Sequence, residues 1–245
     1  MKTSNGCSGC HSSLKHFGLL LRQLERVCSL PIDGSHRCLI FALPQMNVTP
    51  TVEDRKISLR KEAVTRRAHL AAEYGASLTR MDKGLASFAG SLIDQFCPTI
   101  VAGYWPVRSE IDILPLLSVL QDKGVHLCLP ITGLAGTPLS FHHWTFGTAL
   151  DTGRFGIKQP FPDAQQLFPD VVCVPLLAFD STCHRLGYGG GYYDRTLADL
   201  RKKGHKVSAV GLAYAGQQID RLVTGPYDEQ LENVLTSEGW LVRQE

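Results

Sequence analysis

The chain has 245 residues, of which 44% are hydrophobic and 20% charged, as expected for a globular protein with one well-packed core. Its 25 basic and 23 acidic residues give a net charge of +2, which is too balanced for a general nucleic-acid binder. No stretch of about 18 apolar residues occurs, so no segment is expected to cross a membrane. We therefore expect a soluble protein without nucleic-acid or membrane partners. We also expect it to be a monomer in the cytoplasm.

The eight cysteines do not form a disulfide framework. Cys97, Cys128 and Cys173 each stand alone among apolar residues, as buried thiols usually do, and this pattern favours a reducing compartment. The pair Cys7 and Cys10 resembles half of a zinc site, but no other cysteine lies at a spacing that completes it. A leader without a metal is the interpretation that we favour for this segment.

Residues 1–45 differ in composition from the rest, with four of the cysteines, many serines and few acids. A basic amphipathic helix over Leu14–Leu24 would fit a transit peptide, whereas the apolar stretch Phe17–Leu21 is too short for a secretory signal. We expect a poorly ordered or extraneous leader, with Met46 as an alternative start. The folded domain is then predicted to span residues 46–245.

The first predicted elements are helical. Thr51 followed by Asp54 resembles a capping box, and a proline-free stretch with helical apolar spacing continues to about Gln95. Two helices are predicted there, with a break near Gly84. Later helices are predicted over Glu110–Lys123 and Tyr192–Lys203.

Short apolar runs between the helices predict strands over Thr99–Trp105, Val125–Pro130, Leu139–Trp144, Asp170–Phe179 and Ser208–Tyr214. The run Asp170–Phe179 is nearly continuous in valine and leucine, which is typical of a strand buried on both faces of a parallel sheet. The alternation of strands and helices predicts one α/β domain with a mostly parallel sheet flanked by helices, in a Rossmann-like topology.

A glycine-rich turn, Arg-Leu-Gly-Tyr-Gly-Gly-Gly-Tyr-Tyr-Asp-Arg, runs from Arg185 to Arg195 between a predicted buried strand and a predicted helix. Glycines let backbone N–H groups approach an anion closely, and the helix N-terminus adds positive potential, so this arrangement favours phosphate. The two arginines are suited to phosphate oxygens, and Asp194 in the first helical turn is suited to Mg²⁺. The spacing fits neither a Walker A loop nor a dinucleotide fingerprint. A tight turn without a ligand is the alternative.

The helix near the start of the domain carries Lys56, Arg60 and Arg67 on one predicted face. Like charges at this spacing repel by roughly a few tenths of a kcal/mol, so an anionic partner would relieve a small cost. A solvated helix face is the alternative interpretation.

Glu110 and Asp112 follow the first predicted strand, at the carboxyl end where open α/β sheets place ligands. A carboxylate there can accept two hydrogen bonds from an amino-imino ring edge, and a neighbouring aromatic residue can cover the ring. Alternatively, Glu110 only favours the N-terminus of the following helix.

Six segments, in this order and spacing, resemble the 5-formyltetrahydrofolate cyclo-ligase (methenyltetrahydrofolate synthetase) family from about Lys56 to the C-terminus: Lys56–Arg60, Tyr104–Asp112, Leu129–Pro130, Val174–Asp180, Arg185–Arg195 and Pro226–Thr236. The glycine turn with its Tyr-Tyr-Asp ending is the most specific of them. Tyr188 and Gly190 stand where animal members have basic residues, so the resemblance is to the bacterial type.

The resemblance implies ATP-dependent conversion of 5-formyltetrahydrofolate to 5,10-methenyltetrahydrofolate, with release of ADP and phosphate, by a cytoplasmic ligase of one-carbon metabolism that uses Mg²⁺. The formyl oxygen attacks the γ-phosphate, and N10 closes the ring as phosphate leaves. Carried over by motif, the catalytic residues are Arg185 and Asp194, the metal ligands Asp194 and Asp228, and the folate-binding residues Trp105 and Glu110. ATP would be bound by Lys56, Arg60, Arg185, Leu186, Gly187, Tyr188, Gly189, Gly190, Gly191, Tyr192 and Tyr193.

Two other functions are compatible with a glycine turn that binds an anion. The first is an α/β enzyme of sugar phosphates or CoA esters, which would need neither Glu110 nor two magnesium carboxylates. The second is a nucleotide-binding regulator that binds ATP without turnover. ADP release that depends on folate distinguishes the cyclo-ligase from both.

Overall fold

The computed structural model describes residues 51–77 and 84–243. The predicted leader, the cysteine pair within it and the alternative start at Met46 lie outside these residues. The described residues belong to one compact unit, Thr49–Glu245. None of the helices described is both long enough and apolar enough to span a membrane.

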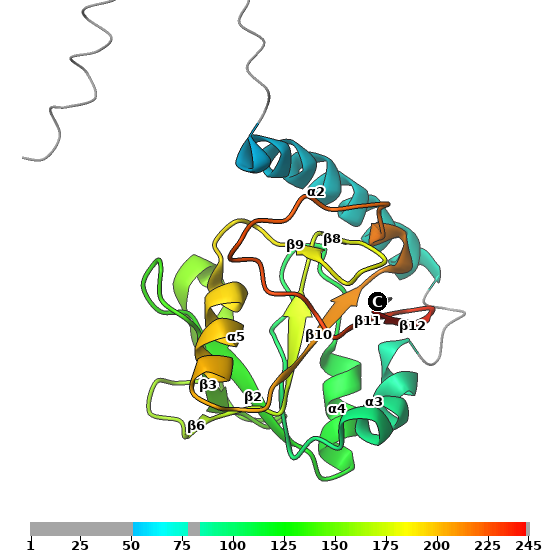
Figure 1. Cartoon of the computed structure of the whole chain (residues 1–245). Helices are drawn as coiled ribbons and strands as arrows, with labels where there is room; N and C mark the ends of the chain where they lie inside the picture. The colour runs from blue at the N-terminus through cyan, green and yellow to red at the C-terminus, as the bar shows by residue number, and fades with distance from the viewer. Residues whose placement is uncertain (1–50, 78–83, 244–245) are drawn as a thin grey trace, which may run out of the picture. The chain divides into compact units, whose positions relative to one another are not determined.

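An eight-stranded sheet forms the centre of this unit (Figure 1), with the strand order β12-β11-β10-β7-β1-β2-β3-β6. The strands from β11 to β2 run parallel, whereas β12 and β3 pair antiparallel with their inner neighbours, and β6 pairs antiparallel with β3. The prediction of a mostly parallel sheet is therefore confirmed. In chain order the strands are β1 (Ile100–Ala102), β2 (His126–Ile131), β3 (Ser140–His143), β6 (Gln166–Leu167), β7 (Val171–Pro175), β10 (Ser208–Ala213), β11 (Asn233–Thr236) and β12 (Gly239–Val242).

The strand order reverses direction between β1 and β7. From β1 the chain crosses to β2 on one side, and it later returns to β7 on the other side of β1 before continuing outward to β10 and β11. The segments that follow β1 and β7 therefore leave the same edge of the sheet in opposite directions. This is the switch point at which doubly wound sheets form a ligand crevice, and it confirms the predicted Rossmann-like topology.

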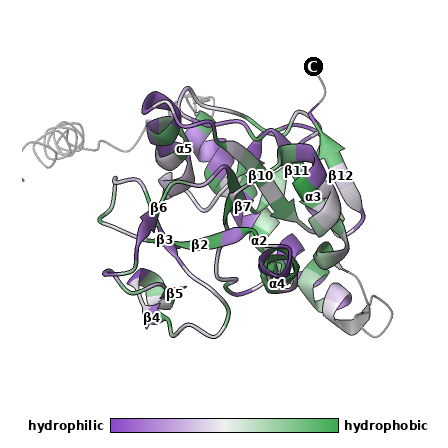
Figure 2. Cartoon of the chain, turned by 90° about the horizontal axis from the view of Figure 1, so that it is seen from below, coloured by the Kyte–Doolittle hydropathy of each residue, from purple (hydrophilic) through white to green (hydrophobic). Residues whose placement is uncertain are grey.

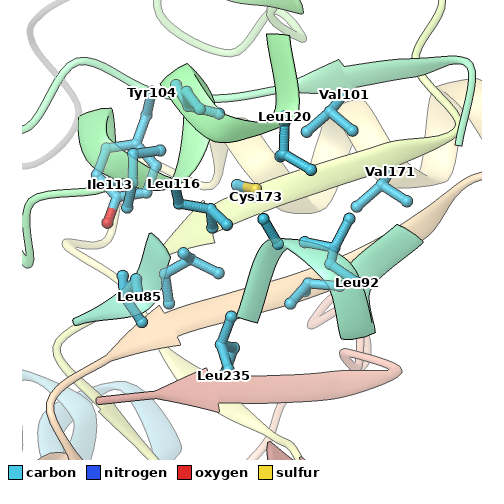
Figure 3. Close-up of a cluster of buried hydrophobic side chains, with 14 of the residues drawn as sticks. Leu85, Leu92, Val101, Tyr104, Ile113, Leu116, Leu120, Val171, Cys173 and Leu235 are labelled. Carbon is cyan, nitrogen blue, oxygen red and sulfur yellow. The ribbon is translucent and has the colours of Figure 1, made fainter. Parts of the chain in front are cut away.

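Helices cover both faces of the sheet (Figure 2). α3 (Ala89–Phe96) and α4 (Leu114–Asp122) pack on the face that carries Val101 and Val171, as Figure 3 shows. α5 (Tyr192–Lys202) packs on the opposite face through Leu197 and Leu200. Successive strand residues alternate between the two cores, which is the pattern expected for a sheet buried on both sides.

α2 (Val52–Ser77) opens the described domain, and its N-terminus has the predicted capping box. The Asp54 N–H donates to Thr51 Oγ1 at 3.1 Å, and Asp54 Oδ2 accepts from the Thr51 N–H at 3.0 Å. The predicted break near Gly84 is also confirmed, because the 3-10 helix η2 (Leu85–Phe88) begins after Gly84 with φ of +33° at that residue. α2 packs through Ala63 on a third, smaller apolar cluster that includes Leu177, Leu186 and Leu222.

The run Asp170–Phe179 is not one strand, as the sequence predicted, but two. Its second part, β8 (Ala178–Phe179), leaves the main sheet and pairs antiparallel with β9 (Arg185–Leu186) in a separate hairpin. The chain departs because the carbonyls of Leu176 and Leu177 accept hydrogen bonds from the Gln217 side chain, at 3.0 and 3.1 Å, instead of continuing the ladder. The small β4 (Asp151–Thr152) and β5 (Lys158–Gln159) hairpin, β6, β9, β11 and β12 were not predicted.

The cysteine predictions are partly wrong. Cys128 and Cys173 are buried in the sheet, as expected, but Cys97 is exposed. Cys97 occupies the left-handed position that ends α3, with φ of +44°, and this position directs it away from the apolar face of the helix.

Truncating the core below α4 is expected to destabilise the fold. Leu120 is fully buried between α4 and the sheet, so Leu120→Ala should lower the free energy of unfolding by about 2–5 kcal/mol. Leu134→Ala is the control, because Leu134 is 68% exposed and its loss should change the free energy by less than about 0.5 kcal/mol. Urea denaturation measures both, and equal effects of the two variants would contradict the packing described.

Candidate active site

The glycine turn connects β9 to α5. The sequence predicted that the turn follows a strand of the main sheet, but it follows the β8–β9 hairpin instead. Gly189 and Gly191 have φ of +94° and +62°, and Gly191 is the N-cap of α5. Among the described residues, no acceptor takes a hydrogen bond from the backbone N–H of Gly189, Gly190 or Gly191. The turn thus presents unused N–H donors at the positive end of a helix, as an anion site requires.

α2 lies against this turn through Arg60. The Arg60 Nε donates to the Gly187 carbonyl at 3.1 Å, and its Nη1 donates to Glu53 at 2.7 Å. A Cβ at Gly189 would lie 3.2 Å from the Arg60 Cζ, in addition to requiring the unfavourable positive φ. The close approach of the helix to the turn therefore depends on glycine at this position.

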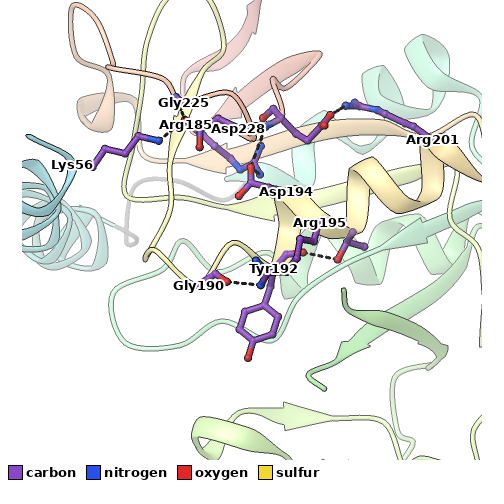
Figure 4. Close-up of polar contacts among 11 residues, drawn as sticks. Lys56, Arg185, Gly190, Tyr192, Asp194, Arg195, Arg201, Gly225 and Asp228 are labelled. Carbon is purple, nitrogen blue, oxygen red and sulfur yellow. Dashed lines mark hydrogen bonds and ion pairs between the residues drawn. The ribbon is translucent and has the colours of Figure 1, made fainter. Parts of the chain in front are cut away.

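A second arginine is buried at the start of the turn, beside Asp194 (Figure 4). Arg185 has a side chain that is 5% exposed, and its Nη2 donates to Asp194 Oδ1 at 2.5 Å. Burial lowers the pKa of Arg185, while the carboxylates of Asp194 and Asp228 oppose that effect. Arg185 thus lies within electrostatic range of both predicted metal ligands.

Asp228 comes from the loop between β10 and β11 and pairs with Lys56 of α2. Its Oδ2 also accepts from the Gly225 N–H at 2.7 Å. Burial raises the pKa of Asp228, but the hydrogen bonds from Lys56 and Gly225 outweigh this, so the pKa lies below its ordinary value of 3.8. Lys56 and Asp228 join the start of the domain to its end.

The two aspartates leave one oxygen each for another ligand. Asp194 Oδ1 accepts hydrogen bonds from Arg185 and from the Glu229 N–H. Asp228 Oδ2 accepts hydrogen bonds from Lys56 and from the Gly225 N–H. Within residues 51–77 and 84–243, no donor contacts the second oxygen of either carboxylate, and no three His, Cys, Asp or Glu side chains form a metal cluster. This donor set fits Mg²⁺, which usually binds one or two carboxylates and completes its coordination with water and phosphate.

Glu110 lies after β1 in a buried position. Its side chain is 5% exposed; Oε2 accepts from the Val107 N–H at 3.1 Å, and Oε1 lies 3.7 Å from the Arg67 Nη1. Burial raises the pKa of Glu110, against the opposing effects of the Val107 N–H and Arg67. The helix-N-terminus interpretation of Glu110 is wrong, because α4 begins at Leu114 with no acidic residue in its first turn and the Glu110 carboxylate instead accepts from the Val107 N–H. Asp112 is the carboxylate next to this helix, and it accepts from the Leu114 N–H at 2.9 Å.

Trp105 is half-buried and contacts the aromatic cluster beside α4. Its ring meets the Trp144 ring edge-on, with centroids 6.2 Å apart. An open depression of about 430 Å³ lies elsewhere, lined by Ser181, Gln218, Ile219 and Asp220 rather than by the glycine turn.

Comparison with known proteins identifies the family of this chain. The family model described as the 5-formyltetrahydrofolate cyclo-ligase family matches residues 52–237. The chain belongs to this family.

Two curated 5-formyltetrahydrofolate cyclo-ligases are similar over most of their length. That of Haemophilus influenzae is 32% identical over 163 residues, which are 63% of this chain and 84% of the relative. That of Mycoplasma pneumoniae is 39% identical over 185 residues, 75% of this chain and 99% of the relative. The NMR structure of Aquifex aeolicus 5,10-methenyltetrahydrofolate synthetase is 29% identical, with a TM-score of 0.59 over 78% of this chain and 93% of that chain. The predicted family, fold class and enzyme class are thereby confirmed.

The predicted site residues of this cyclo-ligase lie in two groups. Lys56, Arg60, the glycine turn, Asp194 and Asp228 surround the N-terminus of α5, whereas Trp105 and Glu110 lie after β1. Arg67 contacts both groups, because its Nη2 donates to the Tyr188 hydroxyl and its Nη1 lies 3.7 Å from Glu110 Oε1. Burial raises the pKa of Tyr193 in the turn, Glu110 adds to the rise, and Arg185 opposes it. The two groups therefore converge at the β1–β7 switch point.

One side chain at this convergence, Arg67, was not assigned to the site from sequence. Arg67 is 1% exposed, so the solvated-face interpretation is wrong for it. Arg67 shares a predicted helical face with Lys56 and Arg60, and this pattern could have indicated that it belongs to the site. The pattern alone does not distinguish a buried arginine from an exposed one. Tyr193, in contrast, was predicted from sequence as an ATP-binding residue.

Replacing Lys56 with Met is expected to raise the pKa of Asp228 toward its ordinary value of 3.8, because the main hydrogen bond that stabilises the carboxylate is lost. The pKa of the folded state is depressed, so the pair stabilises the fold above the ordinary pKa, and this contribution is lost as pH falls through the folded value. Carbon-13 NMR titration of the Asp228 carboxyl group measures the shift. Lys61→Met is the matched control on the exposed face of α2, and an unchanged Asp228 pKa in Lys56→Met would contradict the pairing.

Proposed function

We propose that this chain converts 5-formyltetrahydrofolate and MgATP to 5,10-methenyltetrahydrofolate, ADP and phosphate, with the nucleotide phosphates bound at the glycine turn. The observation that carries this proposal is the set of unused N–H groups at Gly189–Gly191, directly beside Arg60 and the N-terminus of α5. Phosphate oxygens are the acceptors that such a turn fits best.

The charged residues around the turn supply the rest of the nucleotide site. Arg60 of α2 contacts the turn through the Gly187 carbonyl, Lys56 of the same helix pairs with Asp228, and Arg185 pairs with Asp194 in the first turn of α5. Asp194 and Asp228 would hold Mg²⁺ through their unused oxygens, and the bound ion would offset charge on the phosphates. The remaining turn residues, Leu186, Gly187, Tyr188, Tyr192 and Tyr193, complete the proposed ATP contacts.

The folate is proposed to bind at the segment after β1. The Glu110 carboxylate is suited to the amino-imino edge of the pterin, because it can accept two hydrogen bonds from neighbouring N–H groups. The half-buried ring of Trp105 is suited to cover an aromatic part of the substrate. This placement brings the formyl group toward the nucleotide across the switch point.

The proposed chemistry consists of two displacements. The formyl oxygen attacks the γ-phosphorus, an O–P bond forms, and the bond to ADP breaks. N10 then attacks the formyl carbon, a C–N bond closes the ring, and the formyl oxygen leaves as part of inorganic phosphate while the N10 proton passes to solvent. The chain mainly positions the reactants and neutralises charge, with Arg185 and Asp194 nearest the transferred group.

The extent of the catalytic domain and the oligomeric state of the enzyme are also proposed. We infer that residues 46–245 form the catalytic domain, since the family match at 52–237 lies inside it, and that this domain acts as a cytoplasmic monomer. Light scattering of the purified chain measures the mass, and a dimer at assay concentration would contradict the monomer.

The direct test mixes the purified chain with 5-formyltetrahydrofolate and MgATP and follows the near-ultraviolet absorbance of the conjugated methenyl product. Absorbance should rise only when both substrates and magnesium are present, with one ADP released per product. A folded sample that binds ATP but forms no methenyl product would contradict the proposal.

Asp194→Asn is expected to lower kcat/KM by roughly 100-fold, because it removes the charge that would hold the metal while keeping an oxygen for Arg185. Asp199→Asn on the same helix is the control, since Asp199 only pairs with the exposed Lys203. Initial rates over a magnesium titration measure both variants. Full turnover of Asp194→Asn at ordinary magnesium would show that the metal assignment is wrong.

Glu110→Gln is expected to raise the KM for 5-formyltetrahydrofolate by roughly tenfold and to change the KM for ATP little, because an amide cannot accept from both N–H groups. Asp112→Asn is the control, since Asp112 is exposed and its cap to Leu114 survives the change. Steady-state kinetics with each substrate varied measures the difference. A raised KM for ATP with an unchanged KM for the folate would reverse the assignment.

A further inference from the structure

Arg67 is a fully buried arginine with an unusual set of partners. It lies in the middle of α2 with 1% of its surface exposed. Burying a guanidinium costs several kcal/mol unless its charge and its N–H groups are satisfied. The buried charge is therefore unfavourable unless its partners compensate for it, and these partners identify the segments that Arg67 joins.

The partners of Arg67 come from three separate segments. Its Nε donates to Ser109 Oγ at 3.2 Å, and its Nη1 donates to the Leu176 carbonyl at 3.2 Å. Its Nη2 donates to the Tyr188 hydroxyl, and the guanidinium also lies over the Tyr188 ring, 5.3 Å from the centroid. One side chain thus joins the segment after β1, the segment after β7 and the glycine turn.

These contacts connect the two halves of the candidate site. Ser109 precedes Glu110, whose Oε1 lies 3.7 Å from Arg67 Nη1, and Tyr188 stands inside the glycine turn between Gly187 and Gly189. Tyr188 is 45% exposed, and its neighbours in the turn are held by other arginines, since Arg60 donates to the Gly187 carbonyl and Arg195 to the Gly190 carbonyl. A movement of the turn therefore acts on the same guanidinium that faces Glu110.

We propose that Arg67 is a positioning residue that couples the two substrates, so that nucleotide binding at the glycine turn, acting through Tyr188 and Arg67, fixes the Glu110 segment for the folate. This inference rests on the proposed function of the two half-sites. Arg67 itself, being buried, touches neither substrate. The coupling is reciprocal, since two linked sites change each other's affinity by the same factor.

The test compares the affinity for 5-formyltetrahydrofolate with and without magnesium and a non-hydrolysable β,γ-imido analogue of ATP, by titration calorimetry. In the unaltered chain the analogue should lower the Kd of the folate by at least about fivefold, the lower limit of ordinary coupling. Tyr188→Phe, which removes one hydroxyl and keeps the ring, and Arg67→Met should each reduce this factor to below about twofold. Arg66→Met, at the exposed neighbouring arginine, should keep the full factor.

The outcomes separate coupling from a structural role. A Tyr188→Phe chain that binds both ligands more weakly but keeps the full factor would overturn the proposal, and so would an unaltered chain without coupling. If Arg67→Met does not fold, the coupling factor of Tyr188→Phe alone decides whether the turn and the Glu110 segment are coupled. Failure of the proposed function is a different result, because it would appear as an absence of methenyl product in the unaltered chain.

Discussion

The parallel pairing of β1 with β7 is the constraint on which the rest of the structure depends. The segment that carries Glu110 begins at the end of β1, and the segment that leads through the β8–β9 hairpin to the glycine turn begins at the end of the neighbouring β7, although the two are far apart in sequence. The two apolar cores hold this pairing from both faces, through α3 and α4 on one side and α5 on the other. The site is thus a consequence of topology, and the packing of the helices keeps it in place.

The basic side chains around this crevice are paired with carboxylates. Lys56 pairs with Asp228, Arg185 with Asp194, and Arg67 faces Glu110, so each of these three cations already has an acidic partner. Such pairs prevent the cost of unpaired buried charge in the free protein. They also leave the cations near the glycine turn, where an anionic ligand and a metal would redistribute the partners. The same residues therefore stabilise the domain and surround the proposed phosphate site.

The sequence predicted the elements with strong periodicity or capping, such as the α2 N-terminus at Thr51 and the buried β7, and the motif placed the glycine turn correctly before α5. It did not predict that the valine-rich run would turn away after Pro175, because that depends on Gln217, which is distant in the chain. Nor could it separate the buried Arg67 from the half-buried Arg60, since both occupy one helical face. Contacts between distant segments decide these features, and local patterns do not contain them.

The central claim is that the glycine turn is the phosphate site of this cyclo-ligase, and amide NMR of the chain during a titration with magnesium and the β,γ-imido ATP analogue tests it most directly. The account predicts that the largest shifts occur at Gly189, Gly190 and Gly191, whose N–H groups are unused, followed by the first turn of α5. Shifts confined to the depression beside Ser181 and Asp220, with the turn unaffected, would contradict it.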